Sequence, residues 1–160
     1  GRRRREGCAR FGLASYHGQC IGKQLAMLIS SVCVKHFLHA PPEERERLWK
    51  AEADKTLGTM LRNLEASKVT LPSGIHGRLG RALVVRNRLA HNFFFETDKA
   101  ILTDDGREDL IAELRESSDF LASVDAELTE VYESWMIAKG VSTRAQIDAA
   151  VSDYLKDVPR

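Results

Sequence analysis

Three side chains able to serve phosphate chemistry lie within one short segment of the chain, at Arg86, Asn87 and His91. A histidine near neutral pH can accept or release a proton, and an arginine guanidinium can hold a phosphate. Together they could run a metal-free attack of a ribose 2′-hydroxyl on its own phosphate. His91 would act as general base or acid, and Arg86 would stabilise the charge on the phosphorane. Arg88 is a candidate contact to the RNA backbone.

This segment falls late in an amphipathic pattern that predicts a helix, with Ser73 as its N-cap and its end near Phe94. Asn87 and His91 are four residues apart, so they share one face, and Arg86 lies about 100° from Asn87 around the helix. The positions expected to be buried are Ile75, Leu79, Leu83, Ala90 and Phe94.

The run Arg86-Asn87-Arg88-Leu89-Ala90-His91 resembles the R-N-x-L-A-H form of the R-x4–6-H motif of HEPN domains. The stretches 55–58 (Lys-Thr-Leu-Gly) and 93–95 (Phe-Phe-Phe) are also similar to that superfamily. The resemblance implies a small helical bundle, and many HEPN domains are metal-independent endoribonucleases of toxin–antitoxin, antiviral and RNA-processing systems. It further implies that Arg86 and His91 are the catalytic pair, with Asn87 as polar helper, in a cleft at a symmetric dimer interface.

The chemistry gives its own reason to expect a dimer. Cleavage benefits from both an acid and a base, whereas one helix supplies a single histidine, His91. A two-fold dimer would bring a second copy of the helix to the same cleft. The expected partners are therefore an RNA substrate, a second copy of the chain and, for a toxin, an antitoxin or another neutralising protein.

A second interpretation is a HEPN-like dimer without chemistry that binds a protein or a small ligand. Arg86 and His91 would then form hydrogen bonds across the interface or cap neighbouring helices. The formal net charge of +1, from 24 basic and 23 acidic side chains, favours this alternative because RNA affinity depends largely on cationic contacts. A basic, open surface around His91 would favour the nuclease instead.

No metal or cofactor is expected. His17 with Cys20 and Cys33 with His36 superficially resemble two pairs of zinc ligands. A helix from residue 20 to residue 33 would place the two cysteines about 20 Å apart, too far to share an ion. The chain also has no glycine-rich phosphate loop of the Walker type.

The apolar spacing predicts an all-α fold, an up-and-down bundle of about five helices. Residues 1–17 are expected to form a loose N-terminal arm or a short, poorly defined helix, and residues 18–160 a single helical-bundle domain. The expected helices cover 19–38, 43–67 (with a division at Thr56 or Gly58), 73–94, 108–139 with Gly140 as its stop, and a last one capped by Ser142.

The three cysteines contain no C-x-x-C pair, and no segment reads as a signal peptide. No apolar run is long enough to span a bilayer. These features predict a cytoplasmic protein with reduced thiols and no membrane contact.

Overall fold

The computed structural model describes residues 2–34, 36–67 and 69–156, and within these ranges the chain is helical with no strand. The α-helices are α1 (Arg2–Cys33), α2 (Pro42–Ala53), α3 (Leu57–Ala66), α4 (Ile75–Asn87), α5 (Phe93–Glu96), α6 (Asp104–Ala138) and α7 (Arg144–Lys156). Two 3₁₀ turns, η1 (Phe37–His39) and η3 (Ala100–Leu102), and a π-helical segment, η2 (Arg88–Asn92), lie between them. The expected all-α class is confirmed, although this part of the chain contains more helical segments than the five predicted.

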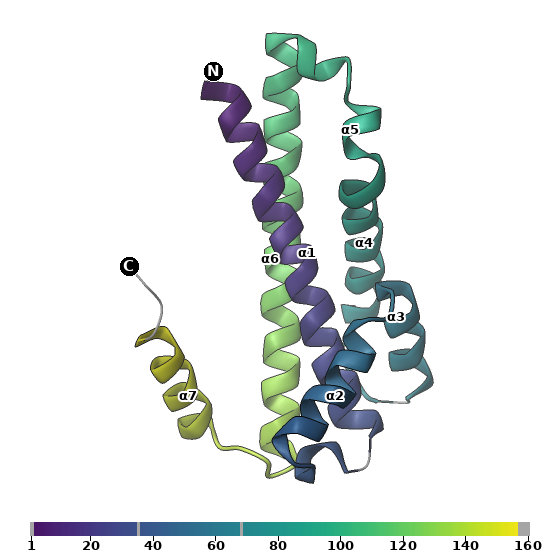
Figure 1. Ribbon diagram of the computed structural model, residues 1–160, viewed down its shortest axis with the longest axis vertical. Helices are drawn as coiled ribbons and strands as arrows, with labels where there is room; N and C mark the ends of the chain where they lie inside the picture. The colour runs from purple at the N-terminus through teal and green to yellow at the C-terminus, as the bar shows by residue number, and fades with distance from the viewer. Residues whose placement is uncertain (1, 35, 68, 157–160) are drawn as a thin grey trace.

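The two longest helices, α1 and α6, pack side by side and run in the same direction (Figure 1). Their paired residues show the parallel register: Glu6 meets Arg115, and Gln24 donates to Asp125 at 2.7 Å. The Ser31 hydroxyl lies 3.2 Å from the Tyr132 phenol. Residues further along α1 thus contact residues further along α6, as in a parallel pair.

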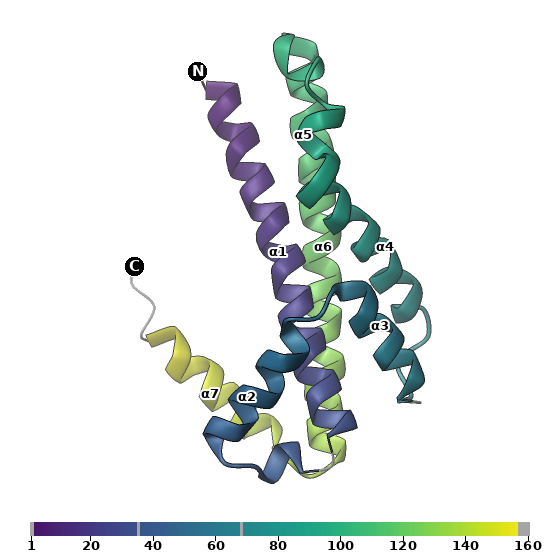
Figure 2. The ribbon, with the colours of Figure 1, turned by 45° about the vertical axis from the view of Figure 1, so that its right-hand side comes forward.

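Helices α2 to α5 connect the end of α1 to the start of α6. Helices α2 and α3 pack on the C-terminal half of α1, and α4 runs back in the opposite direction against α1 and α6 (Figure 2). This path brings the end of α4, which carries Arg86, against the middle of α1.

The core is a continuous stripe of apolar side chains from α1, α3, α4 and α6. The apolar residues that recur at helical spacing in α1 and α6 supply a large part of it, and these side chains are buried: Ile21, Leu25, Leu28, Ile29, Leu110, Leu114, Leu121, Val124 and Leu128. Fully burying an aliphatic side chain of this size contributes about 1.5–3 kcal/mol. These two helices therefore supply much of the stability that holds α4 in place.

The structure corrects the prediction for the N-terminus. Residues 2–17 belong to α1, whereas residue 1 of the expected arm lies outside the described residues. Ala14 is fully buried, and the Phe11 ring lies 5.5 Å from that of Phe93. Packing against α5 and α6 outweighs the weak helix propensity of Gly7 and Gly12, which suggested a loose arm.

The expected division of the second helical stretch is confirmed at Thr56. This residue is extended, with φ −66° and ψ 150°, and its hydroxyl accepts a hydrogen bond from the Thr59 backbone N–H at 3.2 Å. An N-cap hydroxyl satisfies an otherwise unpaired backbone amide. Thr56 therefore marks the point where the turn after α2 ends and α3 begins.

The last helix has a different cap from the one predicted. Gly140 has φ 68° and ends the α6 segment as expected, but Thr143, not Ser142, caps α7. Its hydroxyl accepts from the Gln146 N–H, and its own N–H donates to Gln146 Oε1 at 2.9 Å, so Thr143 and Gln146 form a capping box. No α7 side chain is buried, and residues 157–160 of the predicted domain lie outside the described residues.

Among the described residues, no helix is both long enough and apolar enough to cross a membrane.

Candidate functional site

Arg86 lies on the face of α4 that packs on the core. At 100° per residue, Ile75, Leu79, Ala82 and Arg86 fall on one narrow stripe, and Leu89 and Phe93 continue it. The other five side chains of this stripe are buried, and Arg86 is half-buried among them. Placing a charged group on such a stripe is costly unless something compensates its desolvation, so the position of Arg86 needs an explanation.

A glycine on the facing helix makes room for Arg86. A Cβ added to Gly18 of α1 would lie 3.1 Å from Arg86 Cγ and 3.5 Å from Arg86 Cβ. Any side chain at position 18 would therefore displace the arginine stem. Gly18 was not predicted as a site residue, although Gly18 and Gly22 have the four-residue spacing that often lets two helices approach closely.

The same geometry corrects three details of the predicted helix. Gly74, with φ 89°, occupies the N-cap position instead of Ser73, because it adopts the left-handed conformation that glycine tolerates. Ala90 and Phe94, expected to be buried, are exposed. The buried residues are their immediate neighbours Leu89 and Phe93, which lie in phase with Ile75.

His91 lies on a widened turn of the helix. Residues Arg88–Asn92 form a π-helix, in which the Phe93 N–H bonds to the Arg88 carbonyl five residues earlier. In a regular α-helix Arg86 and His91 would be about 140° apart around the axis. Since a π-turn brings residues five apart closer to alignment, η2 reduces this angle; such turns are frequent at functional sites.

The His91 side chain is exposed to solvent. It forms no hydrogen bond or ion pair with another described residue, so its ring is free to meet a ligand. His76, the other histidine of α4, lies roughly 22 Å away along the axis. The helix thus presents one histidine at the site, as the sequence predicted.

Asn87 is half-buried and works with Arg86. The Arg86 Nη1 donates a hydrogen bond to Asn87 Oδ1 at 3.1 Å, whereas no such bond joins Asn87 to His91 in the described part of the chain. The amide therefore orients the guanidinium group. The hypothesis from the sequence that Asn87 orients His91 or the scissile phosphate stays a prediction.

Arg88 faces α6 and is held by carboxylates. Its Nε donates to Glu96 at 2.7 Å, its Nη1 donates to Glu113, and its guanidinium lies 5.6 Å from the centre of the Phe93 ring. The hydrogen bond to Glu113 is the main cause that raises the pKa of Arg88 above its ordinary value, against desolvation. Its charge is already balanced, which argues against the expected contact with the RNA backbone.

A small cleft of about 190 Å³ opens between α1, α4 and the start of α3. The residues that line it include Gly18, Gly22, Lys23, Lys55 and Arg86, and no carboxylate lines it. Arg86 therefore meets the solvent in surroundings that are positive, whereas Arg88 meets negative ones. Lys55 belongs to the stretch 55–58 noted from the sequence, but neither lysine was predicted as a site residue, because no local spacing connects them to Arg86.

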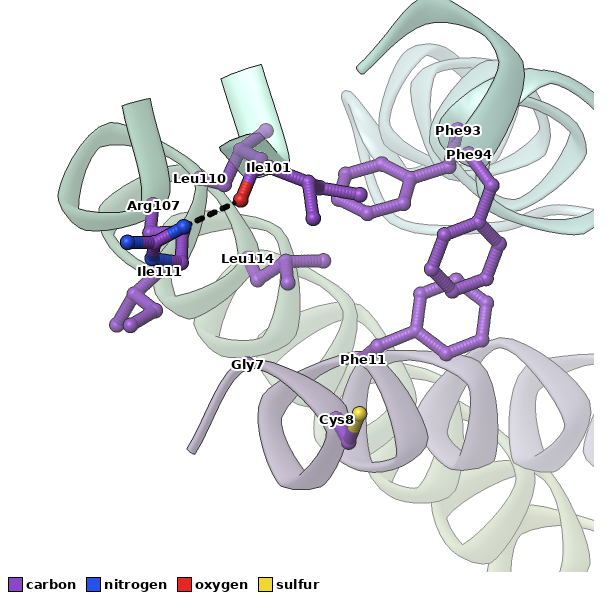
Figure 3. A pocket seen from close by; sticks show the side chains of 10 residues that line it. All are labelled: Gly7, Cys8, Phe11, Phe93, Phe94, Ile101, Arg107, Leu110, Ile111 and Leu114. Atoms are coloured by element: carbon purple, nitrogen blue, oxygen red, sulfur yellow. Dashed lines mark hydrogen bonds between the residues drawn. The ribbon is translucent and has the colours of Figure 1, made fainter. Parts of the chain in front are cut away.

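A second cavity, of about 360 Å³, lies beyond the π-turn between α1, α5 and the start of α6 (Figure 3). Its walls are almost wholly apolar, and the Phe11 and Phe94 rings lie 4.7 Å apart. Its one charged side chain, Arg107, donates from Nη1 to the Ile101 carbonyl at 2.6 Å. Apart from the Cys8 thiol, none of the side chains that line this cavity could serve acid–base chemistry near neutral pH.

A polar network joins α1 to α6 one turn from the Gly18 contact. Asp125 Oδ1 accepts from Gln24, whose Oε1 in turn accepts from the Thr129 hydroxyl at 2.8 Å. His17 Nδ1 lies 4.0 Å from Asp125 Oδ2, beyond hydrogen-bond distance. Desolvation raises the pKa of Asp125 above its ordinary value, and the charge of His17 opposes this.

This network predicts a pH effect on stability. An acid whose pKa is raised by folding contributes stability at low pH, and that contribution is lost as the pH rises through the raised pKa. Asp125→Asn removes the ionisation and keeps an oxygen to accept from Gln24. The free energy of unfolding of Asp125→Asn, relative to the parent, should therefore increase between pH 3.5 and pH 7 in urea titrations. Asp119→Asn, at an exposed position of the same helix, is the control, and an equal change there would contradict the assignment.

No group of three possible metal ligands gathers in residues 2–34, 36–67 and 69–156. Comparison of the chain with known protein families, curated proteins and solved structures finds no match.

Proposed function

We propose that this protein is a metal-independent endoribonuclease of the HEPN type that works as a homodimer, in the role of a toxin or a defence component. One arrangement supports the proposal above all. An arginine without a described carboxylate partner lies on the core-facing stripe, and an exposed histidine follows it on a π-turn. Folding stability explains neither choice of residue.

In the proposed reaction His91 takes the proton of a ribose 2′-hydroxyl while that oxygen attacks the adjacent phosphorus. Arg86, oriented by Asn87, stabilises the negative charge on the phosphorane. The bond from phosphorus to the 5′-oxygen then breaks. The 5′-oxygen keeps the electron pair of that bond and receives a proton from the general acid. The products are a 2′,3′-cyclic phosphate end and a 5′-hydroxyl end.

The acid in this scheme is His91 of a second copy. Large apolar side chains are exposed along α4 and α5, as a surface for self-association would require: Val84 is 68%, Phe94 57% and Phe95 89% exposed. A two-fold axis near this surface would bring two copies of the motif together. The same surface could also take the neutralising protein of a toxin.

The rival is a HEPN-like dimer that binds a partner without cleaving RNA. The balanced charge of the whole chain and the neutralised Arg88 favour it. The open, carboxylate-free surroundings of Arg86 and the exposed His91 favour the nuclease. We therefore place the nuclease first.

Incubation with single-stranded and structured RNA in EDTA tests the proposal. Cleavage that leaves 2′,3′-cyclic phosphate ends, and that is lost in Arg86→Ala, is the expected result. Cleavage that requires a divalent ion would exclude the mechanism. An intact RNA panel after incubation with folded, dimeric protein would favour the interaction module.

A further inference from the structure

The cleft beside Arg86 collects positive charge from three parts of the fold. Arg86 comes from α4, Lys23 from α1 and Lys55 from the turn before α3. Like charges that line one concave surface repel each other and attract an anion to it. The balance of nearby carboxylates decides how much of this charge is available.

Among the described residues, Lys55 alone of these three cations has a carboxylate partner. Its Nζ lies 2.5 Å from Glu52 Oε2, and this buried carboxylate also accepts from Asn63 at 3.1 Å. Neither Arg86 nor Lys23 forms an ion pair with a carboxylate in the described part of the chain. Two cations therefore remain unbalanced at the cleft.

The opposite flank of α4 shows the alternative arrangement. There a cleft is lined by Arg81 and Arg88, but also by Glu113 and Glu116. Arg88 is bound to Glu113, so the charges of that flank largely cancel. The helix thus separates a balanced, structural side from a cationic side that can attract an anion.

We propose that the cationic cleft binds a phosphate of the RNA backbone that does not react, next to the phosphate that is cleaved. This inference rests on the proposed nuclease function. Lys23 is then a binding residue of the substrate track, and Arg86 connects the track to the reacting phosphate. His91 follows Arg86 by five residues, roughly 7 Å along the helix axis.

The size of the cleft favours a group on a chain over a whole metabolite. Its volume of about 190 Å³ is below the roughly 300–1,000 Å³ of pockets that enclose complete small ligands. A backbone phosphate needs only this local contact, because the rest of the polymer remains in solvent. Free phosphate shares the same chemistry and must be distinguished by experiment.

Lys23→Gln is the suitable variant, because the Lys23 side chain is exposed and only its carbonyl has a structural role, accepting from Trp49 Nε1 at 3.3 Å. Lys55 is unsuitable, because its removal would leave the buried Glu52 without its cation. Lys23→Gln is combined with His91→Ala to prevent cleavage, and the Kd of labelled single-stranded RNA is measured at several salt concentrations. Lys139→Gln, at the exposed end of α6, is the matched control.

We expect Lys23→Gln to weaken RNA binding roughly threefold to tenfold and to reduce the slope of log K against log salt by about 0.7, the value of one phosphate contact on a single strand. Lys139→Gln should change neither. An unchanged Kd and slope would overturn the inference. So would Lys23-dependent binding of inorganic phosphate without an effect on RNA, which would assign the cleft to the free ion.

The two proposals can fail separately. RNA cleavage by the parent protein together with a neutral Lys23→Gln leaves the nuclease intact and removes the phosphate site. Lys23-dependent RNA binding without any cleavage leaves the phosphate site intact and removes the nuclease.

Discussion

Replacing His91 by alanine should slow RNA cleavage by about 10²–10⁴-fold, the usual contribution of a general acid or base. In a two-fold dimer the substitution removes both proton-transfer groups, so the upper part of this range is expected. The side chain is exposed and has no hydrogen-bond partner among the described residues, and stability should therefore change little. Initial rates on a fluorogenic RNA, together with thermal unfolding of both proteins, measure the two effects.

His76→Ala provides the control. This histidine is also exposed and lies in the first turn of the same helix, far from the π-turn. The His76→Ala protein should cleave RNA at the rate of the parent. If His91→Ala also kept the parental rate, the assignment of acid–base chemistry to this residue would be wrong, whatever activity the protein has.

Gly18→Ala should lower kcat by roughly tenfold to a hundredfold without a loss of thermal stability. The new methyl group would lie 3.1 Å from Arg86 Cγ, so the arginine stem must move. The stem has to move by a few tenths of an ångström. A displacement of about 1 Å in a catalytic group is enough for a hundredfold effect, so we expect the loss to lie toward the lower end of this range. Alanine also favours a helix over glycine by about 1 kcal/mol, which offsets strain from the contact.

Gly12→Ala separates these two causes. Gly12 lies on the same helix, and nothing lies within 4 Å of a Cβ built there. This variant should gain helix stability and keep its kcat. Equal kcat values for Gly18→Ala and the parent would mean that the position of Arg86 does not limit the reaction.

The regular parts of the fold could be predicted from the sequence, because they depend on spacing. The buried faces of α1 and α6 follow from apolar residues three and four apart, and Thr56 shows the division between α2 and α3 through its capping hydroxyl. These features are local. A residue and its neighbours within one or two turns contain the necessary information.

The errors arise where contacts distant in sequence decide the outcome. Residues 2–17 contain Gly7 and Gly12 and read as a loose arm, yet α6, about a hundred residues later, keeps them helical. A choice between adjacent residues, such as Leu89 or Ala90, requires the exact helical phase, and a small error there exchanges a buried position for an exposed one.

The motif itself could be found in the sequence, but its surroundings could not. The surroundings of Arg86 and Arg88 differ because the two side chains face different helices. Gly18 and Lys23 lie more than 60 residues before Arg86 and meet it only through the packing of α1 on α4. No local pattern shows that contact.

The parallel pairing of α1 with α6 also has a consequence for folding during synthesis on the ribosome. Gln24 and Asp125 are 101 residues apart, so closing this contact carries the entropy cost of a long loop. During synthesis α1 emerges about a hundred residues before the part of α6 with which it pairs. The part of its apolar face that α6 covers is exposed until then, when a chaperone could bind it. Arg86 packs against Gly18 of α1 beside Leu121 of α6, so it reaches its final position only after α6 has docked.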